Sequence, residues 1–191
     1  MQKRKYVAAI SDTDILIHLT KAGHLSLLEQ LFEVVYLPEY IFMKELKKKA
    51  GLLFYDIEKI IMDPSSIFVI VADNDMDLTQ KQVKKLTLNE IGDLVGRGEA
   101  ECAALSKAKD IPIIISDNST EFKFLSEFIM LTYFDLLALC THHGIMNSGE
   151  AEIIYNDINN ILDHKSGDSF DVKCSRTLGR IVANGWNKIL L

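Results

Sequence analysis

The sequence predicts an α/β protein built on a largely parallel sheet. Along residues 6–145, short runs of apolar and often β-branched residues alternate with segments whose apolar residues recur at helical spacing. Such runs are typical of strands buried on both faces, and their alternation with helices is typical of parallel strand–helix–strand units. No strand pattern follows residue 132, so we predict one domain over residues 1–145 and a helical C-terminal extension over residues 146–191.

The composition is that of an ordinary globular protein. The chain has 191 residues, of which 48% are hydrophobic and 25% are charged, and this excludes a disordered or low-complexity protein. The net charge of −6 disfavours a protein that coats duplex nucleic acid, because such proteins neutralise phosphates with a basic surface. A nuclease remains compatible with this charge, since metal-binding carboxylates are themselves negative.

Five apolar runs account for the predicted strands. They are rich in Val and Ile, and they end at polar or turn-forming residues. The predicted strands are residues 6–10, 34–37, 67–71, 112–116 and 129–132.

Helical spacing and end signals account for the segments between the strands. Apolar residues after Asp14 recur at helical spacing until Gly23, Pro38 suits the first turn of a helix, and Gly144 ends another. Asn147 and Glu150 form a capping-box pattern, and a polar loop over residues 164–171 precedes the last helix. The predicted helices are residues 15–22, 25–32, 41–49, 52–62, 99–109, 136–143 and 147–162, with others starting near residues 79 and 119 and after residue 171.

Two carboxylates follow directly after predicted strands. Asp12 comes after the first strand, and Asp117 comes after the strand at residues 112–116. Ligands of parallel α/β sheets bind beyond the carboxyl ends of the strands, so these two side chains are expected to lie near each other. Glu45 lies on the helix after the second strand and Glu99 opens an alanine-rich helix, so four acids from separate segments are expected to meet in one pocket.

Four converging acids call for a cation. Two carboxylates about 4 Å apart repel each other by about 4 kcal/mol at an effective dielectric constant near 20. Mg²⁺ and Mn²⁺ prefer oxygen ligands and relieve this repulsion. A metal ion held in this way activates water and neutralises charge in the hydrolysis of a phosphodiester. Each acid taken alone has a plainer interpretation, as a helix cap, a turn residue or a solvated side chain.

Four ordered motifs carry a resemblance to a known family. They are Ser11-Asp-Thr-Asp-Ile-Leu-Ile17, Val35-Tyr-Leu-Pro-Glu-Tyr-Ile-Phe-Met-Lys-Glu-Leu46, Gly98-Glu-Ala-Glu-Cys-Ala-Ala-Leu-Ser106 and Ile113-Ile-Ile-Ser-Asp-Asn118. Their order and spacing over residues 6–145 resemble a PIN domain, a family of metal-dependent ribonucleases, and in particular the VapC-like subgroup whose third motif reads GEAE. The resemblance implies a three-layer α/β/α domain with a mainly parallel sheet.

The resemblance also implies roles for particular residues. Asp12, Glu45, Glu99 and Asp117 match the acidic quartet of the family, in which these positions bind one or two Mg²⁺ or Mn²⁺ ions and position the attacking water. Asp12, Asp117 and Glu99 are then the expected metal ligands, assisted by Ser116 and Asn118. Glu101 lies about 200° from Glu99 around a helix and is expected on another face. Asn118 stands where related sequences often carry a second Asp.

Two other functional interpretations stay open at this stage. A PIN scaffold that binds RNA or a protein without cutting is one of them. The other is a haloacid-dehalogenase-like phosphatase, in which Asp12 would be the nucleophile of an Asp12-Thr-Asp14 motif, although Leu16 breaks that motif. No glycine-rich phosphate loop occurs, so the divalent metal is the only cofactor expected.

The remaining predictions concern partners and location. Lys44, Lys47 and Lys48 are candidates for binding the RNA backbone, against the simpler interpretation of a solvated helix end. The expected partners are single-stranded or structured RNA, an antitoxin protein if the chain is a toxin, and a second copy in a homodimer. The three cysteines are widely spaced and no segment could span a membrane, so a cytoplasmic protein is expected.

Overall fold

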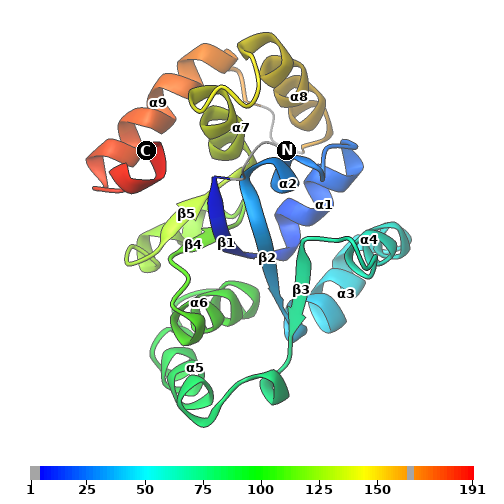
Figure 1. Ribbon diagram of the computed structural model, residues 1–191, viewed down its shortest axis with the longest axis vertical. Coiled ribbons are helices and arrows are strands. Elements are labelled where there is room, and N and C mark those ends of the chain that lie inside the picture. Colours follow the sequence, from blue (N-terminus) through cyan, green and yellow to red (C-terminus); the bar gives the residue numbers. More distant parts are fainter. Residues whose placement is uncertain (1–4, 163–165) are drawn as a thin grey trace.

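A five-stranded sheet forms the centre of the molecule, with every neighbouring pair of strands parallel (Figure 1). The computed structural model describes residues 5–162 and 166–191. The strand order is β3-β2-β1-β4-β5. The strands are β1 (Tyr6–Ser11), β2 (Phe32–Pro38), β3 (Phe68–Val71), β4 (Ile113–Ile115) and β5 (Ile129–Leu131).

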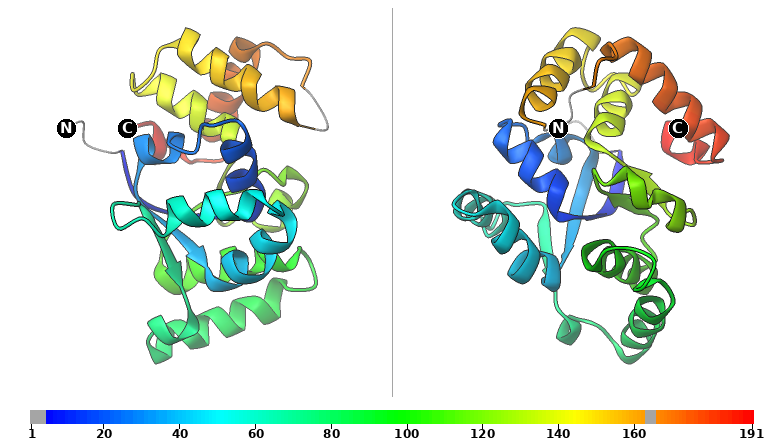
Figure 2. Two further views of the ribbon diagram at one scale, coloured as in Figure 1. Left: turned by 90° about the vertical axis from the view of Figure 1, so that its right-hand side faces the viewer. Right: turned by 180° about the vertical axis from the view of Figure 1, so that it is seen from behind.

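Helices cover both faces of this sheet, which confirms the predicted three-layer α/β/α class (Figure 2). The α-helices are α1 (Thr13–Lys21), α2 (Leu27–Leu31), α3 (Lys47–Ala50), α4 (Leu53–Ile61), α5 (Leu78–Ile91), α6 (Arg97–Lys109), α7 (Tyr133–His142), α8 (Ser148–Ile161) and α9 (Phe170–Ala183). Shorter turns are η1 (Ile41–Leu46), which is a π-helix, and the 3₁₀ turns η2 (Asp73–Asp75), η3 (Ser119–Phe124) and η4 (Asn187–Leu190).

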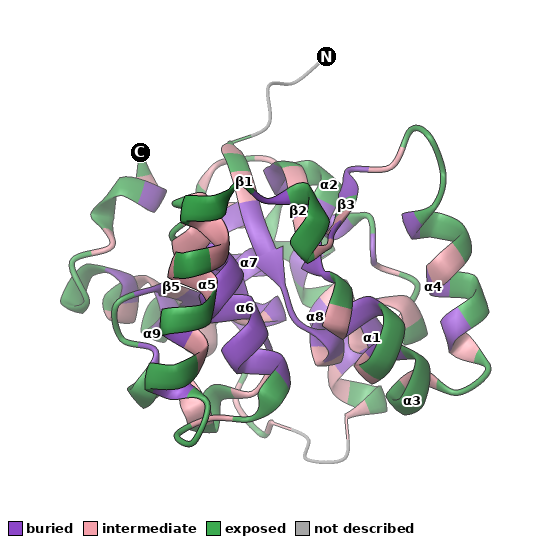
Figure 3. Cartoon of the chain, turned by 90° about the horizontal axis from the view of Figure 1, so that it is seen from below, coloured by how far each residue is buried: buried purple, intermediate pink, exposed green. Residues whose placement is uncertain are grey.

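The two faces of the sheet have separate hydrophobic cores. Successive strand residues point to opposite faces, so Ala9 joins the core beneath α1 and α7, whereas Ile10 joins the core beneath α6. Ile115 and Ile114 of β4 divide in the same way. The buried residues of β1, α6 and α7 therefore lie in the middle of the molecule (Figure 3). The predicted burial on both faces holds for the C-terminal half of β1 and for β4, but Val7 of β1 and Val69 of β3 are exposed because the start of β1 and the edge strand β3 are not covered on both sides.

The C-terminal extension is helical, as predicted, and shares a core with the sheet. Ile158 of α8 and Ile181 of α9 are fully buried in the same cluster as Leu19 and Phe32. The predicted capping box is present, since Asn147 Oδ1 accepts from the Glu150 amide at 2.9 Å. The apolar core thus continues past residue 145, where we place the predicted domain boundary.

Several element ends differ from the prediction. Pro38 ends β2 instead of starting a helix, and the predicted helix over residues 41–49 begins as a π-helix. The turn after Asp117 is a 3₁₀ helix, and α9 starts at Phe170, inside the predicted loop, because the Ser169 hydroxyl caps it. Residues 164 and 165 of that loop lie outside the described residues.

Candidate functional site

The candidate site lies where β1 and β4 pair, which is the point at which the strand order changes direction. Strands follow one another outward from β1 on one side and from β4 on the other. The backbone amide of Asp12 donates to the Ile115 carbonyl at 2.9 Å, so the residues after both strands are neighbours. In open parallel sheets, ligands bind in the crevice at this switch point.

Asp12 is a buried carboxylate with one oxygen that has no partner. Its exposure is 1%, and its Oδ2 accepts a hydrogen bond from Ser116 Oγ at 3.1 Å. Oδ1 has no hydrogen-bond partner within the described part of the chain. Burial, together with the negative charges of Glu99, Asp14 and Glu45, raises the pKa of Asp12 to about 8. This position therefore favours either a proton or a cation.

Glu99 is linked to Asp12 through two polar side chains. The side-chain Nδ2 of Asn118 donates to Glu99 Oε1 at 2.7 Å, and the backbone N–H of Asn118 donates to Ser116 Oγ at 3.2 Å. The structure thus brings Ser116 and Asn118 between the two carboxylates. Thr120, which the sequence did not indicate as a site residue, donates from Oγ1 to Asn118 Oδ1 at 2.6 Å and fixes the orientation of the Asn118 side-chain amide.

Glu45 reaches the same region from the π-helix η1. Its carboxylate lies against the backbone of Gly98, where a Cβ atom would overlap with Glu45 Oε2. Short π-helical segments are frequent at functional sites, and here the segment carries the glutamate of the second motif. Glycine at position 98 allows the carboxylate to approach the first turn of α6.

Lys49 neutralises part of this acidic cluster, which sequence reasoning missed. Its Nζ lies 2.7 Å from Glu45 Oε1 and 2.9 Å from Asp14 Oδ1. Partial burial lowers the pKa of Lys49, but the two carboxylates outweigh this effect and the net pKa is raised. The i,i+4 spacing of Glu45 and Lys49 was a usable signal for this ion pair.

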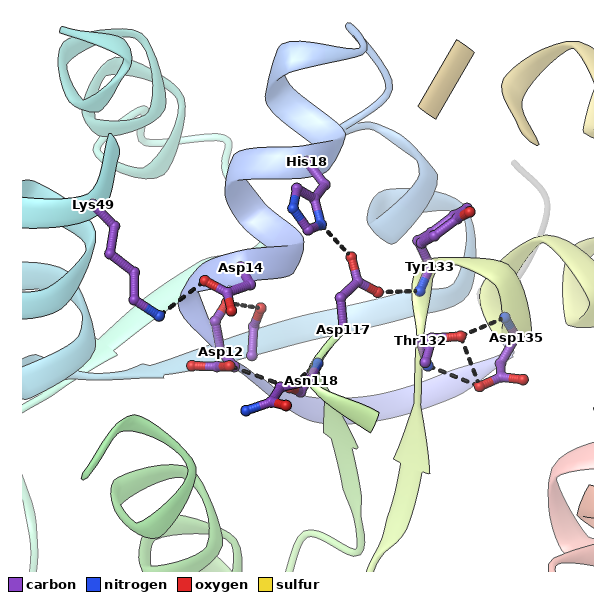
Figure 4. Close-up of polar contacts among 11 residues, drawn as sticks. Asp12, Asp14, His18, Lys49, Asp117, Asn118, Thr132, Tyr133 and Asp135 are labelled. Atoms are coloured by element: carbon purple, nitrogen blue, oxygen red, sulfur yellow. Dashed lines mark hydrogen bonds and ion pairs between the residues drawn. The ribbon is translucent and has the colours of Figure 1, made fainter. Parts of the chain in front are cut away.

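Asp117 comes from the predicted strand end, but its carboxylate points toward other partners. Oδ2 lies 2.7 Å from His18 Nδ1, and Oδ1 accepts from the Tyr133 amide at 2.9 Å. Figure 4 shows the Asp12 and Asp117 carboxylates pointing in different directions. The predicted role of Asp117 as a central metal ligand stays a prediction. The contact with His18 joins residues 99 positions apart, so no local pattern signals it.

The oxygen-rich donor set fits a hard divalent cation in its chemistry. Asp12 and Glu99 are buried, Asp12 has an oxygen without a partner, and Glu45 lies next to Gly98. Among residues 5–162 and 166–191, no three His, Cys, Asp or Glu side chains are oriented to hold one metal ion. Rotation of Glu45 and Glu99 about their side-chain bonds would be needed to direct their carboxylates toward Asp12.

Other singled-out residues lie away from Asp12. Glu101 contacts Arg97 at 2.5 Å and Lys84 at 3.1 Å, so it serves a separate ion-pair cluster. Three lysines that were candidates for RNA binding are exposed on the segment that carries Glu45, and their role stays a prediction; they are Lys44, Lys47 and Lys48.

The cysteines are packing residues. Cys102 and Cys140 are buried, Cys174 is partly buried, and all three are free thiols. Burial raises the pKa of Cys102 well above its ordinary value, which disfavours the thiolate form. Within the described residues, no helix is long and apolar enough to cross a membrane.

The parallel sheet covered by helices and the acids gathered at its switch point define an α/β domain with a candidate cation site. Residues 8–127 match the family described as a PIN domain (DUF3368), and the chain therefore belongs to the PIN-domain family. The matched region contains all four sequence motifs and ends before α7. No curated protein and no solved structure matches the chain. PIN domains are generally nucleases that typically use Mg²⁺ or Mn²⁺, which favours the nuclease interpretation of Asp12 over the phosphatase interpretation.

Proposed function

We propose that the chain is a Mg²⁺- or Mn²⁺-dependent endoribonuclease that hydrolyses RNA phosphodiester bonds. The observation that carries the proposal is the buried Asp12 carboxylate, which has an unpartnered oxygen and lies among other acids at the switch point of the sheet. A carboxylate in this position is stabilised by a cation. Membership of a generally nucleolytic family gives the chemistry for which that cation would be used.

In this proposal the chain's own residues hold and orient the reacting groups. Asp12 and Glu99 would bind the metal, with Glu45 completing the site and Asp117 joining it after release from His18. When bound, the metal supplies activation of water and neutralisation of charge on the phosphate. Ser116 and Asn118 hold the Asp12 and Glu99 carboxylates through hydrogen bonds.

The test is cleavage of a circular single-stranded RNA, because only an internal cut linearises it. We expect linear product with Mn²⁺, none with EDTA and none with Asp12→Asn. Asp56→Asn is the matched control, since it removes one exposed carboxylate on α4 and should cut as the wild type does. Cutting that persists in Asp12→Asn would contradict the proposed site.

A second candidate function is a PIN scaffold that binds RNA without cutting it. The ion pairs of Lys49 with Glu45 and Asp14 favour it, because a cation of the protein itself already occupies part of the acidic cluster. In that case the wild type would bind RNA, Mn²⁺ would not produce cleavage, and Asp12→Asn would bind RNA equally well.

Finer aspects of the proposal concern the biological role. Membership of the VapC-like subgroup with a GEAE motif would make the chain a toxin with a protein antitoxin, and growth arrest on expression in bacteria tests this. Single-stranded and structured RNAs are compared in the same cleavage assay. We also propose a homodimer, which light scattering checks, and a cytoplasmic location, which cell fractionation checks.

A further inference from the structure

We propose that a cleft between η3 and α9 binds the single-stranded RNA that flanks the bond to be cut. The inference rests on the proposed function and adds a binding surface to it. The cleft has a volume of about 670 Å³, which lies within the usual range of ligand sites. Most of its lining residues come from positions 130–186, so the cleft lies largely outside the region matched by the PIN family. We call it the α9 cleft.

The α9 cleft is cationic in a chain that is acidic as a whole. Four basic side chains and two carboxylates line it, whereas the chain carries a net charge of −6. The basic residues are Lys123, Lys173, Arg176 and Arg180, and the carboxylates are Asp135 and Asp168. An excess of positive charge in one concave surface is the electrostatic feature that attracts a phosphate backbone.

Both carboxylates already have partners within the protein. Asp135 accepts hydrogen bonds from Thr177 Oγ1 at 2.8 Å and from Arg180 Nη2 at 2.5 Å. Asp168 accepts from Arg176 Nη1 at 2.5 Å. These pairs use two of the four cations, so the positive charge that remains belongs to two lysines.

The two lysines form no ion pair among the residues that the structure describes, although Asp168 and Asp135 attract Lys173 electrostatically. Lys173 Nζ lies 5.3 Å from the centroid of the Phe134 ring and 5.6 Å from that of Tyr155. Lys123 Nζ lies 4.8 Å from the centroid of the Phe124 ring. Aromatic rings attract these cations but do not neutralise them, so both ammonium groups remain available to an anion.

Apolar and aromatic side chains give the same cleft surfaces for nucleobases. Phe122 and Trp186 line it and are partly exposed, with the Arg180 guanidinium 5.3 Å from the Trp186 ring centroid. Phe134 and Met130 also line it but are buried, so Phe122 and Trp186 are the residues that a base can contact. Bases that are unpaired and unstacked pack against such side chains, and cations nearby contact the phosphates between them. This combination favours single-stranded RNA over a duplex, whose bases are stacked on one another.

The α9 cleft lies next to the residues that surround Asp117. Ser119 lines the cleft and is two residues beyond Asp117. Thr132 also lines it and precedes Tyr133, whose amide holds the Asp117 carboxylate. In this proposal one RNA strand occupies the cleft and continues past Ser119 toward the segment that carries Asp117.

The experiment measures RNA binding in a background that does not cut. Asp12→Asn protein in EDTA is titrated with a short fluorescently labelled single-stranded RNA, and anisotropy is recorded at several salt concentrations. The double substitution Lys123→Gln/Lys173→Gln should weaken binding roughly tenfold and reduce the slope of log K against log salt by about 1.4, if each lysine contacts one phosphate. Trp186 is the only tryptophan in the chain, so its fluorescence reports occupancy of the cleft directly.

The matched control removes two lysines elsewhere. Lys21 and Lys59 are exposed near the ends of α1 and α4, and Lys21→Gln/Lys59→Gln changes the net charge equally. This control should bind RNA like its parent. Thermal melting verifies that each variant is folded, and a duplex of the same sequence should bind more weakly than the single strand.

The outcomes separate this inference from the proposed function. Binding that depends on Lys123 and Lys173 in a protein that never cuts RNA would reject the nuclease and keep the α9 cleft. Cleavage by the wild type with unchanged RNA binding in the lysine variant would reject the cleft and keep the nuclease. RNA binding that leaves Trp186 fluorescence unchanged would also overturn the inference. So would a cleft that binds an acidic peptide instead of RNA, which would be seen as quenching of Trp186 by a Glu-rich peptide together with unchanged RNA affinity in the lysine variant.

Discussion

Asp117 and His18 form a contact of 2.7 Å that turns the Asp117 carboxylate away from Asp12. The same carboxylate accepts from the amide of Tyr133, the first residue of α7. Amides in the first turn of a helix have no partner within the helix, and a negative charge there is favourable to the helix dipole. Asp117 therefore connects α1, the end of β4 and the start of α7.

Asp117→Ala should destabilise the fold. The substitution leaves the Tyr133 amide without its acceptor and removes the partner of His18, while the Asp117 side chain is only 8% exposed. We expect a loss of about 2 kcal/mol in the free energy of unfolding, measured by urea denaturation. Asp56→Ala, which removes an exposed carboxylate, should change it by less than about 0.5 kcal/mol. Equal stability of the two variants would show that the Asp117 contacts contribute nothing.

Asp12→Asn should stabilise the fold, and the size of this stabilisation should depend on pH. The pKa of Asp12 is raised from 3.8 to about 8, so between these values the folded chain keeps a proton that the unfolded chain has lost. Stability of the wild type therefore falls as pH rises through this window, by up to about 1.4 kcal/mol per pH unit. Asparagine is neutral at every pH in this window. The free energy of unfolding of the variant should therefore exceed that of the wild type by little near pH 4 and by most near pH 8.

Denaturation in EDTA at several pH values checks this prediction. Asp56→Asn serves as the control, because an exposed carboxylate should give no comparable trend. Addition of Mn²⁺ at pH 8 should stabilise the wild type more than Asp12→Asn, since a ligand that binds only the folded state adds stability. A difference in the free energy of unfolding between wild type and variant that stays constant from pH 4 to pH 8 would contradict the prediction.

The sequence was sufficient to predict the sheet and the strand ends at which Asp12 and Asp117 lie. Apolar runs and the residues that end them mark the strands, so it could be predicted that Asp12 and Asp117 follow neighbouring strand ends. The capping box at Asn147 was also visible, because its two residues are local to each other.

The orientation of the side chains was not predictable in the same way. His18 and Tyr133 contact different oxygens of the Asp117 carboxylate, and both contacts depend on how α1 and α7 pack on the sheet. The pairing of Lys49 with Asp14 likewise joins separate helices. Sequence periodicity indicates which face of an element is buried, but it does not indicate which of several polar partners a carboxylate will choose.

Gly98→Ala should lower cleavage without harming the fold. A Cβ at this position overlaps with Glu45 Oε2, so the carboxylate must move away from α6. Displacement of a catalytic group by about 1 Å costs up to about a hundredfold in rate, and we expect a loss of at least about tenfold. Alanine is the better helix former, so melting should stay unchanged or rise slightly. Gly179→Ala on α9 meets no atom within 4 Å and is the control, with unchanged cleavage.

The contact between Lys49 and Glu45 predicts how the site responds to metal. Lys49 Nζ also reaches Asp14, so this one cation neutralises two of the acids that raise the pKa of Asp12. Any divalent ion held by Glu45 would have to compete with the Lys49 ammonium group. Lys49→Gln removes the competing charge and leaves the carboxylates more negative, so the affinity of the site for Mn²⁺ should increase.

We expect the Mn²⁺ concentration for half-maximal cleavage to fall roughly tenfold in Lys49→Gln, which corresponds to about 1.4 kcal/mol. Calorimetric titration of the same variant with Mn²⁺ measures the affinity without reference to activity. Lys59→Gln, which removes an exposed lysine of α4, should leave both values unchanged. Weaker Mn²⁺ binding in Lys49→Gln would mean that the lysine holds Glu45 in its binding position, so that the ion pair prepares the site for metal instead of opposing it.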